Sequence, residues 1–82
     1  MKTVTIRLYA SLKERAGFSD CSFEIPDEAN LRTLKNMLER QYPKLRSQLD
    51  NVLVLIGSTS AVEEDIIPAE AVVSFLTPIG GG

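Results

Sequence analysis

One amphipathic helix constrains the fold of this chain more than any other stretch. Its apolar side chains recur at helical spacing: Leu31, Leu34, Leu38 and Tyr42. Asn30 stands directly before this stripe as a predicted N-cap, and Pro43 predicts that the helix ends at residue 41 or 42. Because the stripe has to be buried against an apolar surface, we expect the strands of the chain to form one sheet beneath this helix.

Alternating polar and apolar residues predict strands before and after the helix. Three stretches alternate in this way: residues 3–9, 22–25 and 72–76. Successive side chains of a strand point to opposite faces of the sheet. The side chains expected to face the core are Val4, Ile6, Leu8, Phe23, Ile25, Val73 and Phe75. This assignment leaves Tyr9 and Leu76 on the opposite face.

The most apolar run, residues 52–56, predicts a central strand that is buried on both faces. A right-handed crossover connection would place this strand beside the first one. The shorter predicted elements are a helix over residues 11–16, helical turns over residues 44–49 and a strand at residues 61–62. Ser11 is a plausible N-cap of the short helix, and Gly17 is expected to end it.

This order of elements predicts an α+β fold with one mixed sheet and the main helix across one of its faces. We expect a single domain over residues 1–82, in which residues 77–82 form an extended, flexible tail. If the first and last strands are neighbours, Tyr9 and Leu76 lie close together on the open face. An apolar spot beside a tail is typical of a docking surface.

The composition excludes several classes of protein. The chain has no histidine and one cysteine, so a metal site or a nucleophile with its own base is not expected. The net charge is −2, and the basic residues do not cluster with aromatic ones, which argues against nucleic acid as a partner. No apolar run is long enough to span a membrane. The absence of a signal-peptide pattern and of a disulfide pair points to the cytoplasm.

Two local features have both a structural and a functional interpretation. Cys21 is expected to be a small, half-buried side chain, although a persulfide or an oxidised thiol is the alternative. The acidic run at residues 63–65 lacks the alternating ligands and the central glycine of a calcium loop. We interpret it as a solvated acidic turn.

The last residues of the sequence are the candidate site. Pro78 and Ile79 are followed by Gly80, Gly81 and Gly82. Glycine has no side chain and adopts almost any backbone conformation, so such a tail can thread a narrow channel. The carboxylate of Gly82 would then reach another protein's active site without steric hindrance. Proline restricts the tail and reduces the entropy lost when the tail becomes ordered.

Both ends of the chain resemble a known family. Residues 8–17, LYASLKERAG, are similar to the opening of the MoaD branch of the MoaD/ThiS sulfur carriers, and residues 75–82, FLTPIGGG, are similar to its end. Residues 26–31 resemble the turn that precedes the main helix of that family. The resemblance covers essentially the whole chain and implies a β-grasp, ubiquitin-like fold.

The resemblance also implies a role, that of the small subunit of molybdopterin synthase. A ubiquitin-activating-type adenylyltransferase would use ATP to adenylate Gly82, and a sulfur donor such as a cysteine desulfurase or a rhodanese-like protein would convert it to a thiocarboxylate. The tail, residues 78–81, would insert into the large catalytic subunit, which holds the catalytic residues and passes the sulfur to a pterin precursor. Tyr9 and Leu76 would contact partners, and the chain itself would bind no cofactor and no metal.

Three alternatives remain open at the level of the sequence. A carrier of the same kind could serve the thiazole, the cysteine or another thio-metabolite pathway, although the long segment over residues 9–17 favours the molybdopterin branch. A ubiquitin-like modifier would use Gly82 to form an isopeptide bond with a lysine. A β-grasp interaction domain whose tail is merely flexible is the simplest alternative.

Overall fold

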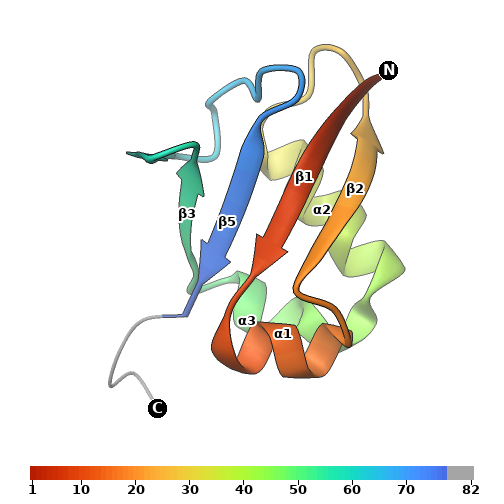
Figure 1. Cartoon of the computed structure of the whole chain (residues 1–82), viewed down its shortest axis with the longest axis vertical. Helices are drawn as coiled ribbons and strands as arrows, with labels where there is room; N and C mark the ends of the chain where they lie inside the picture. Colours follow the sequence, from red (N-terminus) through yellow and green to blue (C-terminus); the bar gives the residue numbers. More distant parts are fainter. Residues whose placement is uncertain (78–82) are drawn as a thin grey trace.

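The computed structural model describes residues 1–77, and these form a sheet with helices packed against one face (Figure 1). In chain order the elements are β1 (Lys2–Leu8), α1 (Ala10–Ala16), β2 (Asp20–Ile25), α2 (Leu31–Gln41), the 3-10 helix η1 (Pro43–Leu45), α3 (Arg46–Leu49), β3 (Leu53–Ile56), β4 (Thr59–Ser60) and β5 (Val72–Leu76). The predicted mixed sheet with one main helix across it is confirmed.

The strands lie in the order β2-β1-β5-β3-β4. β1 is antiparallel to β2 and parallel to β5, and β3 is antiparallel to β5. The first and last strands are therefore neighbours. The prediction that the third strand lies beside the first is wrong, because β5 occupies that place. β5 is the better central strand, since it contributes two fully buried core side chains, Val73 and Phe75.

α2 forms where the apolar stripe predicts it. Asn30 caps the helix, and its side-chain oxygen Oδ1 accepts a hydrogen bond of 2.9 Å from the backbone N–H of Thr33. The helix ends at Gln41, directly before Tyr42 and Pro43. Its leucines are buried, whereas Tyr42 is half-buried and its ring lies 5.0 Å from that of Phe18.

The core lies between the sheet and the helices. All seven side chains assigned to the core-facing strand positions are buried. At the end of the sheet where β1 finishes, one leucine from each of α1, η1 and α3 closes the core, and all three are fully buried: Leu12, Leu45 and Leu49. The short helices therefore seal the core at this end of the sheet.

The predicted central strand is less buried than expected. Leu53 in β3 is 50% exposed, so the prediction of burial on both faces is wrong. The physical reason is the layering, since helices cover only one face of this sheet (Figure 1). β3 is also second from the edge, and outside it lies only β4, with two residues.

Three smaller predictions also need correction. α1 begins at Ala10, and Ser11 is not its N-cap; the Ser11 hydroxyl instead accepts a hydrogen bond of 3.0 Å from Gln48 Nε2. The minor strand β4 comes before residues 61–62, and β2 starts two residues before Ser22. Gly17 ends α1 as predicted, with a left-handed φ of 85° that favours glycine.

Candidate functional site

The pairing of β1 with β5 brings two predicted partner-binding residues together. Leu8 lies opposite Phe75 in this parallel register, and both side chains are buried. Tyr9 directly follows β1 and Leu76 ends β5, each one position beyond this pair, so the alternation of side chains assigns both to the opposite, open face. Leu76 is in turn the register partner of Leu53 in β3. Tyr9, Leu76 and Leu53 thus form an apolar row across three strands.

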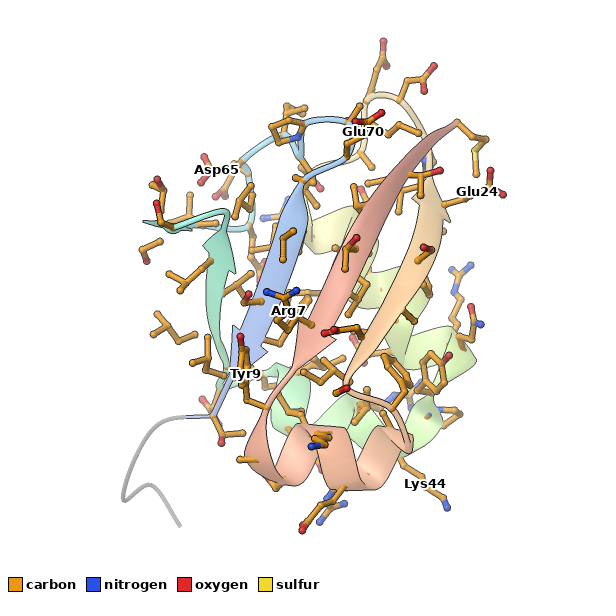
Figure 2. All side chains as sticks on the ribbon, viewed as in Figure 1. Arg7, Tyr9, Glu24, Lys44, Asp65 and Glu70 are labelled. Atoms are coloured by element: carbon orange, nitrogen blue, oxygen red, sulfur yellow. The ribbon has the colours of Figure 1, made fainter. Side chains whose placement is uncertain are left out.

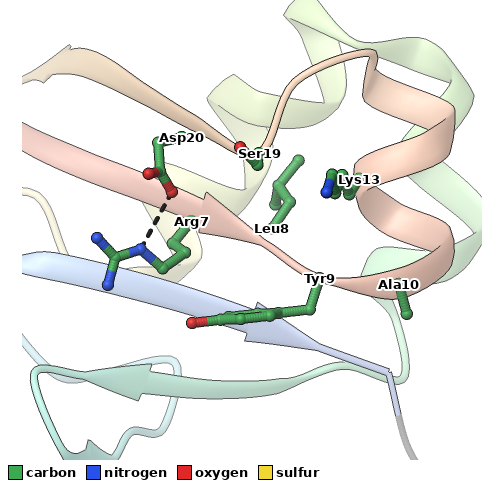
Figure 3. A pocket seen from close by; sticks show the side chains of 7 residues that line it. All are labelled: Arg7, Leu8, Tyr9, Ala10, Lys13, Ser19 and Asp20. Atoms are coloured by element: carbon green, nitrogen blue, oxygen red, sulfur yellow. Dashed lines mark hydrogen bonds and ion pairs between the residues drawn. The ribbon is translucent and has the colours of Figure 1, made fainter.

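The apolar row is accessible to a partner. Tyr9 is 42% exposed and Leu53 is 50% exposed, while Leu76 between them is half-buried. Tyr9 extends from the end of β1 across β5 (Figures 2 and 3). Ser74 also belongs to the open face by its alternation with Val73 and Phe75, yet it is only 7% exposed. The open face is therefore partly covered by its own side chains and presents an amphipathic surface.

A cavity of about 410 Å³ opens beside Tyr9. Its lining includes Lys13, Ser19 and the ion pair between Arg7 and Asp20 (Figure 3). Arg7 Nε donates to the Asp20 carboxylate at 3.0 Å. This hydrogen bond and the charge of Asp20 raise the pKa of Arg7, with a smaller contribution from Tyr9. The Asp20 carboxylate is thus occupied by Arg7.

The predicted chemical end of the chain lies outside the described residues. Gly82, the predicted site of activation, and residues 78–81, the predicted inserting segment, are not among residues 1–77. The last described residue, Thr77, directly follows β5. The apolar row therefore lies at the end of the strand from which the tail continues. Leu53 was missed as a member of this surface because its apolar neighbours in sequence predicted an interior strand.

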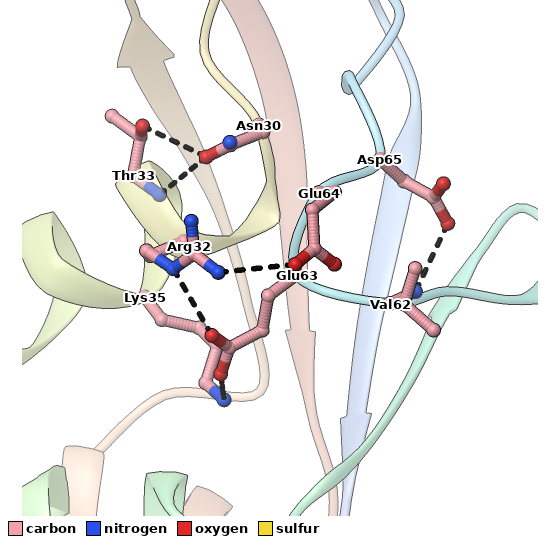
Figure 4. Close-up of polar contacts among 8 residues, drawn as sticks. All are labelled: Asn30, Arg32, Thr33, Lys35, Val62, Glu63, Glu64 and Asp65. Atoms are coloured by element: carbon pink, nitrogen blue, oxygen red, sulfur yellow. Dashed lines mark hydrogen bonds and ion pairs between the residues drawn. The ribbon is translucent and has the colours of Figure 1, made fainter.

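The acidic turn over residues 63–65 is fastened to α2 (Figure 4). Glu63 accepts from Lys35 Nζ at 3.0 Å and from Arg32 Nε at 3.2 Å, and Glu64 accepts from Arg32 Nη2 at 3.2 Å. Lys35, first, and then Arg32 lower the pKa of Glu63. The turn is exposed, as predicted, but its ion pairs with the helix were not predicted.

Backbone hydrogen bonds complete this attachment. The N–H groups of Leu31 and Arg32 at the start of α2 donate to the carbonyl oxygens of Asp65 and Glu63, each at 3.0 Å. Asp65 Oδ2 accepts from the backbone N–H of Val62 at 2.9 Å. The first N–H groups of a helix have no partner within the helix, and here the acidic turn supplies one for two of them. The turn therefore has a structural role at the beginning of α2.

The remaining candidate groups, Cys21 and the acidic side chains of the described residues, are not arranged as a reactive or metal-binding site. Cys21 is half-buried in β2, and burial, followed by the charge of Asp20, raises the pKa of its thiol, which keeps it protonated. Among residues 1–77 no cluster of Cys, Asp and Glu side chains is arranged to bind a metal ion. None of the described helices has the length and apolar character needed to cross a bilayer.

The fold and the apolar row define a class of protein. A mixed sheet with parallel β1 and β5 at its centre and one main helix across one face is the β-grasp, ubiquitin-like fold. The sequence matches the ThiS family over residues 6–82, and the chain belongs to this family of MoaD- and ThiS-type proteins. The match extends through the glycines of the tail. No curated protein matches the chain.

Several solved structures share the fold at low sequence identity. SAMP1 of Haloferax volcanii, a small archaeal modifier protein, is 22% identical with a TM-score of 0.87, over 98% of this chain and 99% of that one. Urm1 of Trypanosoma brucei is 19% identical with a TM-score of 0.74, over 99% and 96%. A chain in the complex of subunits 1 and 2 of the molybdopterin-converting factor from Helicobacter pylori is 18% identical with a TM-score of 0.72, over 98% and 99%. These likenesses establish the ubiquitin-like β-grasp fold.

Proposed function

We propose that this protein is a sulfur carrier whose reactive group is the carboxylate of Gly82. The observation that carries the proposal is the apolar row of Tyr9, Leu76 and Leu53 at the end of β5. Leu76 directly precedes the tail, residues 77–82. A docking surface in this position holds the chain while the tail reaches into a partner. Membership of the ThiS family, with a match through Gly82, supports the same role.

The chemistry requires activation by a partner, because a carboxylate is a poor electrophile. In the proposed first step a carboxylate oxygen of Gly82 attacks the α-phosphorus of ATP in a ubiquitin-activating-type adenylyltransferase, and pyrophosphate leaves. The terminal sulfur of a persulfide on a sulfur donor, such as a cysteine desulfurase or a rhodanese-like protein, then attacks the acyl carbon and displaces AMP, which leaves an acyl disulfide between Gly82 and the donor. A second thiol attacks the donor's sulfur of that disulfide, forms a new disulfide with it and releases a thiocarboxylate whose sulfur can be passed on. Without side chains at Gly81 and Gly82, the reacting carbonyl is accessible from all sides.

The pathway that we propose is the assembly of molybdopterin. The chain would be the small subunit of molybdopterin synthase, and the large catalytic subunit would receive the tail at residues 78–82 and pass the sulfur to a pterin precursor. The complex of the two converting-factor subunits from Helicobacter pylori, one of which shares this fold, supports a partner of that kind. The chain would bind no cofactor itself, and we expect it to act in the cytoplasm. A carrier for the thiazole, cysteine or another thio-metabolite pathway would use the same tail chemistry.

A second candidate function is that of a protein modifier. SAMP1 shares the fold over nearly the whole chain and is described as a small archaeal modifier protein. A modifier would also be adenylated at Gly82, but the acyl group would pass to a lysine amine and form an isopeptide bond. Western blots of lysate from the native cells, with an antibody against the chain, distinguish the two functions. A ladder of heavier bands that contain the chain favours the modifier, and one band at the size of the free chain favours the carrier.

Removal of Gly82 tests the proposed reactive group. We expect the shortened chain to fold normally and to lose ATP–pyrophosphate exchange with the adenylyltransferase. A chain extended by one residue after Gly82 should lose exchange as well, because its carboxylate no longer reaches the nucleotide. The matched control is Thr59→Ala in β4, at the edge of the sheet, which should leave exchange unchanged. Full exchange by the shortened chain would overturn the proposal.

A further inference from the structure

The charged side chains are unevenly distributed along the strands. Exposed acidic residues collect at the end where β1 begins and β2 finishes: Glu24, Asp27, Glu28, Asp65 and Glu70. Glu70 is held there by a backbone hydrogen bond of 2.7 Å from its N–H to the carbonyl oxygen of Thr3. In Figure 2, Glu24, Asp65 and Glu70 lie at this end, and Lys44 lies at the opposite one. The protein is therefore electrically polar although its net charge is only −2.

The opposite end carries exposed cations. Lys13 and Arg15 belong to α1, which follows directly on β1, with the exposed Glu14 between them, and Lys44 belongs to η1, which contacts α1. We call these three residues the basic end. None of them forms an ion pair with an acidic side chain within residues 1–77. At the acidic end, Arg32 and Lys35 are paired with the acidic turn, and Lys2 Nζ donates to the backbone carbonyl oxygen of Asp27.

A partner at the basic end is affected by the local charge more than by the net charge. β1 has seven residues, and an extended strand of this length spans about 20 Å. The Debye length at physiological ionic strength is about 8 Å, so the acidic end is largely screened from a partner that approaches the basic end. The basic end and the apolar row adjoin each other, since Tyr9 immediately precedes α1.

The cavity beside Tyr9 offers a place for an anionic group. Lys13 lines it together with Ser19, Arg7 and Asp20 (Figure 3). Because Arg7 is already paired with Asp20, Lys13 is the cation in this lining without such a partner among the described residues. A single carboxylate side chain fits a cavity of about 410 Å³ and would find a lysine and a hydroxyl there.

We propose that the surface of the adenylyltransferase that receives the tail is acidic where it faces α1, and that one of its carboxylates enters the cavity beside Tyr9 and pairs with Lys13. This inference rests on the proposed function and specifies the chemistry of its partner. The apolar row supplies contact area, and the basic end orients the chain so that the tail points at the partner during encounter. Charges at the rim of an interface act mainly on the association rate and on its salt dependence.

The test measures association of the chain with its purified adenylyltransferase by surface plasmon resonance at low and at high salt. Lys13→Glu reverses the charge in the cavity, and Lys13→Arg retains it. Lys13→Glu combined with Glu24→Lys restores the net charge of −2 but leaves the basic end altered. Thermal unfolding of each variant verifies that the fold is intact.

We expect Lys13→Glu to associate roughly threefold to tenfold more slowly at low salt, with a smaller difference at high salt. The double variant should be equally slow, and Lys13→Arg should match the wild type. Equal rates for all four chains would overturn the inference, and so would recovery of the wild-type rate in the double variant, which would make net charge the cause. In both cases ATP–pyrophosphate exchange by the wild type would leave the proposed function standing. Absence of that exchange in the wild type would overturn the proposed function and, with it, this inference.

Discussion

The two faces of the sheet place adjacent residues of β5 in different roles. Val73 and Phe75 point under the helices and are fully buried, whereas Leu76 is half-buried on the open face between Tyr9 and Leu53. The same five-residue strand thus holds the core and presents the proposed docking surface. Since side chains alternate, a shift of one residue in register would exchange the two roles. The packing of Val73 and Phe75 in the core therefore sets the register of Leu76 and the point at which β5 ends.

The largest expected effect comes from the covered face. Phe75→Ala removes a fully buried aromatic side chain from the core between β5 and the helices. We expect the free energy of unfolding to fall by about 3–5 kcal/mol, as measured by urea denaturation. Leu76→Ala is the matched control on the open face and should lower the free energy of unfolding clearly less. Equal losses for the two variants would contradict the assignment of the faces.

The next effect concerns the open face. Leu76→Glu places a charge in the middle of the apolar row, so we expect partner binding to weaken by at least about tenfold, or about 1.4 kcal/mol. The free energy of unfolding of the chain without its partner should change by less than about 1 kcal/mol. Isothermal titration with the adenylyltransferase measures the binding. Val72→Glu, on the same face at the other end of β5, should bind normally. If Leu76→Glu unfolds the domain, Leu76 belongs to the core.

A smaller effect is expected where the backbone passes from the open face into α1. Ala10, directly after Tyr9, has a φ of 52°, which is unfavourable for a residue with a Cβ atom. Ala10→Gly should therefore raise the free energy of unfolding by about 1 kcal/mol. Gly17→Ala is the control with the opposite sign, because Gly17 has a φ of 85°, which strains a residue with a Cβ atom. No atom of residues 1–77 lies within 4 Å of an added Cβ, so the loss reports the backbone conformation alone. Destabilisation by Ala10→Gly would show that this conformation is not strained.

The smallest effect lies in the ion pairs that fasten the acidic turn to α2. Lys35 and Arg32 lower the pKa of Glu63 in the folded chain. Their stabilising contribution is therefore present above the unfolded pKa of Glu63 and is lost as the pH falls through the lower, folded pKa. Glu63→Gln should slightly lower the melting temperature at neutral pH and should remove this acid-dependent loss. Glu28→Gln, at an exposed turn residue, is the control. Identical pH profiles for wild type and Glu63→Gln would contradict the stabilising role.

Much of the fold follows from local patterns in the sequence. The spacing of Leu31, Leu34 and Leu38 predicts α2, and the alternation of residues 3–9 and 72–76 predicts which side chains are buried. These patterns are reliable because one face of each element contacts the core and the other contacts water. For the same reason the alternation placed Tyr9 and Leu76 on the open face.

What could not be predicted depends on contacts between distant segments. Residues 52–56 are apolar throughout, and nothing in that run indicates that Leu53 faces solvent beside Leu76. Its exposure follows from the single helix layer and from the place of β3 near the edge. The ion pairs of Glu63 with Lys35 and Arg32 join residues 28 and 31 positions apart, so no local pattern reveals them.

The central claim is that the carboxylate of Gly82 becomes a thiocarboxylate. The most direct measurement is the intact mass of the chain after incubation with ATP, the adenylyltransferase and a sulfur donor. The account predicts a species that is heavier by the difference between one sulfur and one oxygen atom, and fragmentation should place that difference at Gly82. If the wild-type chain is adenylated and yet never acquires sulfur, the protein is not a sulfur carrier.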